Sequence, residues 1–239
     1  MNLDALAPAD ARALLLQIAP RLRQDGDDYA SDLARLCGYL PLALRSVASA
    51  LAARIDLSLA DYVPRLKDAR ERLKLTEIDA SLSLSYELLA ADRQKRFRAL
   101  AVFPDTFDVA GTAAVWEAEG NLAQDGLGEL LLYSLLEFNA ASARYQLHNL
   151  VRLFADARLG SAEREVAERR HAEHYKNVIG GANDLYLRGG ESLKKGLALF
   201  DAEWANIQAG QAWAAAHAGE DEAAAVLCSA YANAGTYCL

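Results

Sequence analysis

The sequence has few cysteines, prolines and glycines, and each shortage excludes some classes of protein. Its 239 residues include 3 cysteines, 5 prolines and 15 glycines. Cys37, Cys228 and Cys238 form no CxxC pair and their number is odd, so we expect no disulfide framework and a reducing, cytoplasmic location. Because helix breakers are scarce and alanine and leucine are abundant, the composition favours a helical protein.

Long hydrophobic runs are also missing. No apolar run reaches the roughly 18 residues that are needed to span a bilayer. The start, Met1-Asn2-Leu3-Asp4, lacks the basic and apolar regions of a signal peptide. We therefore expect no membrane partner.

Positive charge is absent from the middle of the chain. No lysine or arginine occurs between Arg98 and Arg144, and residues 76–158 carry 7 Lys and Arg against 12 Asp and Glu. Residues 159–239 carry 7 against 11, whereas residues 1–75 carry 11 against 10. Because phosphate-backbone binding needs clustered Lys and Arg, we expect no direct contact with DNA.

The motifs of phosphate chemistry and of nucleophilic catalysis are missing as well. The pattern GxxxxGK[ST] does not occur, so nothing in the chain would cradle the β- and γ-phosphates of ATP. Residues 100–105 (LAVFPD) faintly resemble a Walker B strand, but they end a predicted helix at a proline and have no Walker A partner. Four histidines and three cysteines suggest no Ser/His/Asp or Cys/His set. We expect the chain not to be an enzyme by itself.

Helical periodicity dominates residues 1–75. Apolar spacing predicts a helix over residues 7–23 and a second that ends near Cys37. Pro41 suits the first position of a third helix, where its missing N–H costs nothing. A fourth helix is predicted over residues 58–73, with a kink at Pro64. Together they predict a four-helix subdomain.

Residues 76–159 combine helices with one β-hairpin. Two short apolar runs, residues 135–138 and 144–147, flank the small polar tract 139–143, which is typical of a hairpin. A helix over residues 149–159 follows. Several helices and a two-stranded wing predict a winged-helix subdomain. The helices predicted before the wing cover residues 81–89, 92–102, 109–117 and 122–136.

From residue 160 onward the pattern is helix after helix. Predicted helices over residues 161–180, 192–217 and 219–235 are separated by Gly180-Gly181, Gly189-Gly190 and Gly219. Helical hairpins joined by small residues favour TPR-like repeats, although no 34-residue self-match is present. No polar capping helix ends the sequence, so we expect residues 160–239 to be a truncated array. The predicted fold class is all-α with one small β-hairpin.

Several motifs occur in the order found in one family. Residues 36–44 (LCGYLPLAL) and 145–155 (YQLHNLVRLFA) are similar to the GLPL and MHD motifs of the NB-ARC class of STAND signalling ATPases. Residues 80–86 (ASLSLSY) and 96–104 (RFRALAVFP) also resemble stretches of bacterial members. Residues 200–207 (FDAEWANI) resemble the segment that often opens their TPR-like region. The resemblance covers about residues 3–158 and extends to about residue 217.

This resemblance implies two nucleotide-binding residues. The proline of GLPL, here Pro41, packs near the base, and the histidine of MHD, here His148, reaches a phosphate of bound ADP. Imidazole suits that role because it donates hydrogen bonds to phosphate oxygens. Asn149 replaces the usual aspartate; asparagine is an equally good N-cap, but the charge is lost. The alternative for both residues is a local role in starting a helix.

The predicted function is the regulatory module of a STAND NTPase. It would close over ADP in the resting state and release on nucleotide exchange, which permits signalling or oligomerisation. The resemblance implies ADP and ATP as ligands of a longer parent, a slow ATPase, and none for this chain alone. Expected partners are the nucleotide-binding domain of the same protein, a second copy on activation and a protein ligand of the TPR-like region. The alternatives are a nucleotide-independent helical scaffold and part of a SARP-type transcriptional regulator whose DNA contacts lie elsewhere.

Two further side-chain groups have structural interpretations. Glu168, His171 and His174 share a helix face and could bind a metal, but one such helix supplies half a site, so we predict no metal. Trp204 and Trp213 lie at helical spacing with Ile207 and Leu199, which is more typical of a helix-pair core than of a ligand site.

Overall fold

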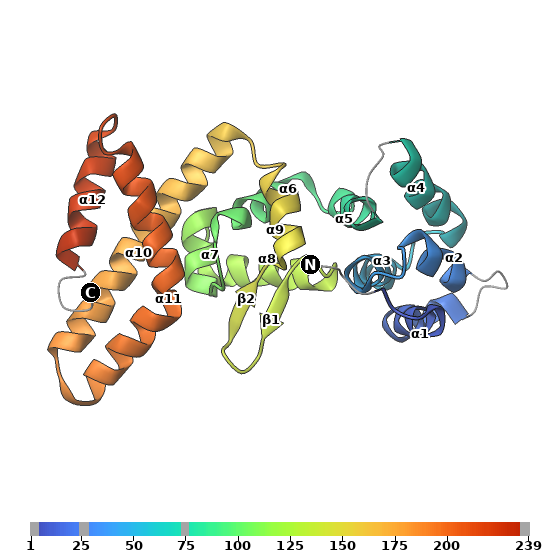
Figure 1. Cartoon of the computed structure of the whole chain (residues 1–239), viewed down its shortest axis with the longest axis horizontal. Coiled ribbons are helices and arrows are strands. Elements are labelled where there is room, and N and C mark those ends of the chain that lie inside the picture. The colour runs from blue at the N-terminus through green and yellow to red at the C-terminus, as the bar shows by residue number, and fades with distance from the viewer. Residues whose placement is uncertain (1–4, 24–28, 73–76, 235–239) are drawn as a thin grey trace. The chain divides into compact units, whose positions relative to one another are not determined.

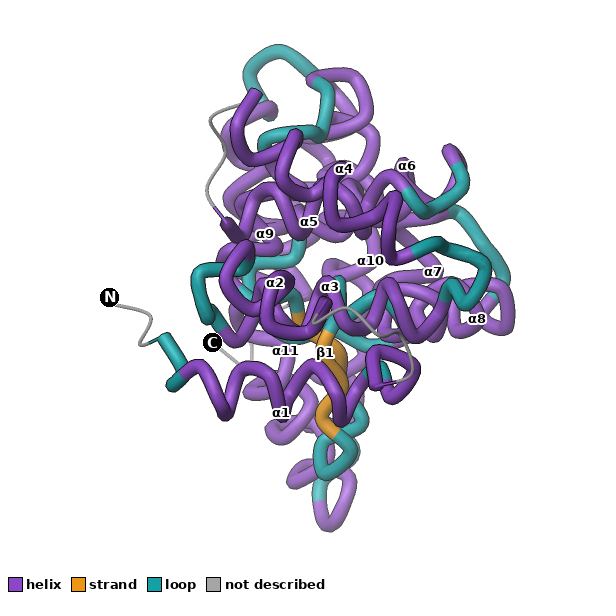
Figure 2. Tube along the Cα trace, turned by 90° about the vertical axis from the view of Figure 1, so that its right-hand side faces the viewer, coloured by secondary structure: helices purple, strands orange, loops and turns teal. Residues whose placement is uncertain are grey.

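The computed structural model describes residues 5–23, 29–72 and 77–234. The protein is all-α with one small β-hairpin, as the sequence predicts (Figures 1 and 2). The chain forms two compact units, one of Met1–Gln94 with Gly126–Glu137 and the other of Lys95–Asp125 with Phe138–Leu239. The predicted domains over residues 1–75, 76–159 and 160–239 stay predictions, because the two units are defined by spatial contact and not by ancestry.

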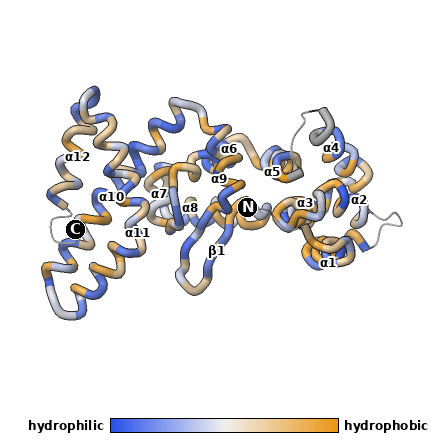
Figure 3. The backbone as a smooth tube through the Cα atoms, in the orientation of Figure 1, coloured by the Kyte–Doolittle hydropathy of each residue, from blue (hydrophilic) through white to orange (hydrophobic). Residues whose placement is uncertain are grey.

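The first unit is built around one central helix, α3, which starts at Pro41 as predicted. Helix α3 covers Pro41–Ala53. The other elements of this unit are α1 (Pro8–Ile18), the 3-10 helix η1 (Pro20–Arg23), α2 (Tyr29–Leu36), α4 (Leu59–Arg72), α5 (Glu77–Glu87), the start of α6 (Ala91–Ala99) and the end of α8 (Gly120–Leu132). Hydrophobic residues gather along α1 and α3 in Figure 3. From Ala43 to Leu51 only Arg45 is exposed, so α3 is covered on nearly every side.

Small side chains let α5 approach α3 closely. The hydroxyl oxygens of Ser46 and Ser85 lie 2.7 Å apart, and Ser46 also donates to the carbonyl oxygen of Ser81 at 3.3 Å. All three serines are fully buried. A buried hydroxyl is costly without a partner, so these bonds offset the cost of placing polar groups in the core of this unit.

The second unit contains the hairpin and the long C-terminal helices. Its elements are the end of α6, the 3-10 helix η2 (Leu100–Val102), α7 (Val109–Trp116), the start of α8, β1 (Glu137–Asn139), β2 (Arg144–Gln146), α9 (Asn149–Asp156), α10 (Ser161–Leu187), α11 (Gly190–His217) and α12 (Glu222–Ala234). Phe107 pairs with Tyr145 of β2 through two backbone hydrogen bonds of 2.9 and 2.8 Å. This bridge attaches the segment before α7 to the hairpin.

One predicted helix boundary in this unit is wrong. Helix α10 does not end at Gly180-Gly181 but continues to Leu187. Two glycines cost a helix about 1 kcal/mol each relative to alanine, but Ile179 and Ala182 are buried beside them. Packing along α10 therefore outweighs the local preference. The chain turns instead at Gly189 and Gly190, whose φ angles are 69° and 57°.

Other boundaries shift by a few residues. The first predicted helix ends at Ile18 and is followed by a 3-10 turn, and α8 ends at Leu132, four residues earlier than predicted. The predicted helix ends at Leu73 and at residue 235 lie outside the described residues. In the part of the chain that the structure describes, no helix is long and apolar enough to cross a membrane.

Candidate functional site

A hollow of about 250 Å³ lies at the start of α9, within the second unit. Two segments form its walls: residues 103–105, which follow η2, and residues 146–149, where β2 leads into α9. Arg152 completes the lining from the next turn of the helix. The full lining is Phe103, Pro104, Asp105, Gln146, Leu147, His148, Asn149 and Arg152.

His148 caps the helix that borders this hollow. Its Nδ1 accepts a hydrogen bond from the backbone N–H of Leu150 at 3.3 Å, and its side chain is half-buried. A ring nitrogen that accepts a hydrogen bond carries no proton, so in the neutral ring the proton is on Nε2. The cap thereby fixes the tautomer that offers an N–H donor to a ligand.

Arg152 adds a positive charge on the same side. It follows His148 by four residues, in the helix that His148 caps, and both side chains line the hollow. Its guanidinium makes no ion pair with a described residue. A helix start, an imidazole and a guanidinium together favour an anionic group such as a phosphate. Asp105 brings a carboxylate to the opposite wall, so the charge of the hollow is mixed.

The two predicted nucleotide-binding residues lie in different units. Pro41 is half-buried at the first position of α3, after a turn in which Gly38 and Tyr39 both have a φ of 59°. The backbone N–H of Leu6 donates to the carbonyl oxygen of Tyr39 at 2.9 Å, which ties the N-terminal segment to this turn. Both nucleotide roles stay predictions.

The sequence interpretation missed two charged residues of the hollow. Arg152 lies only four residues after His148, in the helix that His148 caps, and this short separation was a signal that could have identified it. Asp105 had no such signal, because it is far from His148 along the sequence and reaches the hollow only through the fold.

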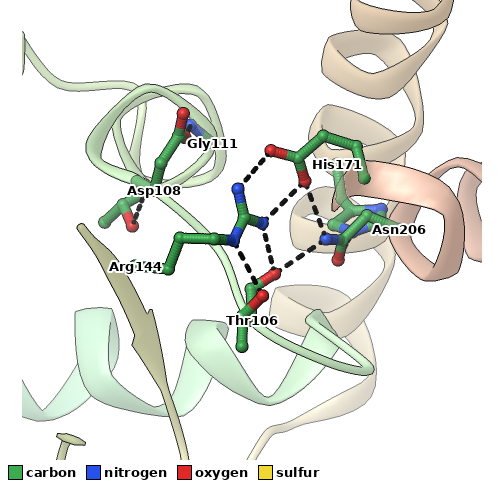
Figure 4. A network of polar contacts seen from close by, with 8 residues as sticks. Thr106, Asp108, Gly111, Arg144, His171 and Asn206 are labelled. Atoms are coloured by element: carbon green, nitrogen blue, oxygen red, sulfur yellow. Dashed lines mark hydrogen bonds and ion pairs between the residues drawn. The ribbon is translucent and has the colours of Figure 1, made fainter. Parts of the chain in front are cut away.

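The buried network beside the hollow was also missed, and Figure 4 shows it. Arg144 of β2 donates to both carboxylate oxygens of Glu203 on α11, at 2.6 and 2.8 Å. It also donates to the hydroxyl and the carbonyl oxygen of Thr106, at 2.7 and 2.8 Å. Although burial lowers the pKa of Arg144, the hydrogen-bonded Glu203 raises that pKa above its ordinary value overall.

Of the proposed metal-binding residues, His171 is part of the hydrophobic core. It is 3% exposed, its Nε2 lies 3.4 Å from Oδ1 of Asn206, and its ring meets that of Phe103 edge-on. Burial lowers the pKa of His171 to about 4. Among the described residues, no group of three or more His, Cys, Asp and Glu side chains is arranged to hold a metal ion.

The predicted core residues of α11 are buried to different extents. Ile207 and Trp213 are buried, and the indole of Trp213 stacks on the ring of His217. Leu199 and Trp204 are only half-buried. Trp204 packs against Phe200, with ring centroids 5.0 Å apart.

The chain is similar to regulatory protein AfsR. It is 36% identical to AfsR of Streptomyces coelicolor over 173 residues, which cover 69% of this chain and 17% of AfsR. It is 35% identical to AfsR of Streptomyces griseus over 165 residues, 66% of this chain and 17% of AfsR. A disease resistance protein of Arabidopsis thaliana is 28% identical over 185 residues, 65% of this chain and 18% of that protein.

The chain thus spans about a sixth of the length of the curated relatives that it matches. The sequence matches no family model.

Proposed function

We propose that this region is the regulatory module of a STAND-class NTPase. In this proposal it closes over bound ADP in the resting state, with His148 donating from Nε2 to a phosphate and Pro41 lying against the base. Nucleotide exchange then releases the module and permits self-association. The P-loop and the metal-binding acid belong to another domain, and this region by itself hydrolyses nothing.

The observation that carries the proposal is the hydrogen bond that Nδ1 of His148 accepts from the backbone N–H of Leu150. A helix cap needs only an acceptor, and Asn, Asp or Ser would serve equally well. An imidazole that accepts through Nδ1 also keeps an N–H donor at Nε2, and His148 and Arg152 both line the hollow. That donor suits a ligand with acceptor oxygens, such as a phosphate. The similarity to a plant disease resistance protein and to regulatory protein AfsR supports a place in a signalling protein.

A second candidate function follows from the similarity to regulatory protein AfsR, which is shared by two Streptomyces species. Here the region belongs to a SARP-type transcriptional regulator and controls it through the same nucleotide-dependent closure. DNA would be contacted by other domains, because residues 99–143 contain no lysine or arginine. A nucleotide-independent helical scaffold is the interpretation that remains if neither candidate holds.

The test compares two variants of His148 in a protein that carries this region together with a P-loop domain. His148→Ala removes both the cap and the donor. His148→Asn keeps an acceptor for the N–H of Leu150 but is too short to donate where Nε2 lies. A charge-assisted hydrogen bond contributes about 1.5–3 kcal/mol, so we expect ADP retention to fall about tenfold or more in both variants. Basal signalling should rise as the open state gains population.

His217→Ala is the matched control for the ADP measurement. His217 lies on α11, where its Nδ1 is 2.8 Å from the carbonyl oxygen of Trp213, and it does not line the hollow. We expect this variant to keep its co-purified ADP. If His148→Asn retains ADP as the unmodified protein does, His148 is only a helix cap and the proposed phosphate contact is wrong.

A further inference from the structure

The Arg144–Glu203 pair joins two segments that are adjacent in sequence to the walls of the hollow. Arg144 precedes residues 146–149, and Thr106 follows residues 103–105. The guanidinium of Arg144 holds Thr106 through two hydrogen bonds, of 2.7 Å to the hydroxyl and 2.8 Å to the carbonyl oxygen. One residue further along each segment, Phe107 and Tyr145 exchange two backbone hydrogen bonds.

Two residues of helix α11, Glu203 and Asn206, contact Arg144 and Thr106. Both carboxylate oxygens of Glu203 accept hydrogen bonds from the Arg144 guanidinium, and the Glu203 side chain is only 4% exposed. Asn206, one turn later, donates from Nδ2 to the carbonyl oxygen of Thr106 at 2.9 Å and to Glu203 at 3.1 Å. Helix α11 therefore contacts both segments that lead into the walls of the hollow, through Arg144 on one side and Thr106 on the other (Figure 4).

A bidentate pair fixes orientation as well as distance, because both planar groups must stay in register. Between Arg144 and His148 lie only Tyr145, Gln146 and Leu147, and Tyr145 is itself tied to Phe107. A movement of α11 would thus be passed along three residues to the ring that borders the hollow. Loss of one partner alone would leave the other as a buried charge without its counter-ion.

We propose that Arg144 and Glu203 are positioning residues of the His148 site, through which α11 controls the geometry of the hollow. A ligand or partner that displaces α11 would loosen both walls and move the Nε2 donor away from its place. Only the identity of what the hollow binds rests on the proposed function; the mechanical coupling between α11 and His148 does not.

The experiment uses the 239-residue chain and the nuclear magnetic resonance signals of the His148 ring nitrogens and of the Leu150 amide. These signals report the tautomer and the cap hydrogen bond directly. The main variant is Arg144→Met with Glu203→Met, because replacing both partners of a buried ion pair by apolar side chains often preserves the fold. We expect displaced ring-nitrogen signals and at least tenfold faster hydrogen exchange at the amide of Leu150.

A matched control removes another arginine–glutamate pair of the same unit. Arg98 binds both carboxylate oxygens of Glu163 at 3.1 and 2.9 Å, but neither residue lines the hollow. Arg98→Met with Glu163→Met should leave the signals of His148 and Leu150 in place.

A conservative variant separates charge from geometry. Arg144→Lys keeps the charge and loses the planar fork, so we expect a smaller displacement in the same direction. If the double variant does not fold, Arg144→Lys alone tests whether the pair positions His148. Signals of His148 and Leu150 that coincide with those of the unmodified chain, in every folded variant of the pair, would overturn the inference. Because no nucleotide is used, this outcome is independent of the ADP experiment.

Discussion

The hydroxyl of Tyr231 on α12 reaches the carbonyl oxygen of Ala172 on α10, at 2.6 Å, past a position that has no side chain. That position is Gly210 of α11. A Cβ atom there would lie 2.1 Å from the Tyr231 hydroxyl and 3.0 Å from Cα of Ala172. Three helices therefore meet at one glycine, and this close approach is needed to bury the tyrosine.

Gly210→Ala should destabilise the protein by about 2 kcal/mol or more, because the methyl group must displace Tyr231 and break a buried hydrogen bond. Gly181→Ala is the control. Gly181 lies within helix α10 with open space around it, so alanine there should stabilise by about 0.5–1 kcal/mol. Urea unfolding of the two variants measures both effects. Equal changes in the two variants would mean that the contact at position 210 is not tight.

The stability of the second unit should fall in mild acid through His171. Burial lowers its pKa to about 4, below the ordinary value of 6.5. Between these values the unfolded chain binds the proton and the folded chain does not, so the stabilising contribution is complete above pH 6.5 and is lost as the pH falls toward 4. From pH 7.5 to pH 5 we expect a loss of about 2 kcal/mol. Burial also lowers the pKa of His174, which acts in the same direction.

His171→Gln isolates this effect, because glutamine cannot titrate and still offers an amide to Asn206. Its free energy of unfolding should change less between pH 7.5 and pH 5 than that of the unmodified protein. Glu163 and Asp221, whose pKa values are lowered by the hydrogen-bonded Arg98 and Arg169, lose their contribution only at lower pH. An identical pH dependence for His171→Gln and the unmodified chain would contradict the assignment.

The isolated chain should not hydrolyse ATP. Phosphoryl transfer depends on groups that hold the phosphates and the metal, and the sequence contains no P-loop to supply them. The measurement is release of inorganic phosphate from ATP by the purified chain. Turnover that stays with the protein through successive purification steps, at a constant specific activity, would show that the chain has a phosphate site of its own.

The chain should not bind duplex DNA specifically near physiological salt. Residues 76–158 carry a net charge of −5, and α8, the helix before the hairpin, presents Asp125 to solvent. A gel-shift assay is the measurement. As a matched variant, Glu119→Lys with Asp125→Lys reverses two exposed charges and should increase binding at low salt. Sub-micromolar, salt-sensitive binding by the unmodified chain would instead support a DNA-reading role.

Much of the fold could be predicted from the sequence, because its signals are local. Helical spacing, the proline at the first position of α3 and the two apolar runs around residues 139–143 each act within a few residues. These signals predicted the helical class, the hairpin and the placement of His148 at a helix start. The low helix propensity of glycine is an equally local signal, and at Gly180-Gly181 it predicted the wrong boundary. Packing along α10 contributes more to stability than the two glycines cost the helix.

The chain's own sequence thus determined which segments are helices and which residues start them, through steric preferences and hydrogen bonds within a turn or two. The tertiary structure alone decided that residues 103–105 face His148, and that Arg144 pairs with Glu203, 59 residues away. Neither contact has a local signal, because long-range partners are selected by burial of whole helices. Once α11 packs against α10, the charges of Arg144 and Glu203 are largely buried, and their ion pair, together with the hydrogen bonds to Thr106 and Asn206, offsets the cost of that burial.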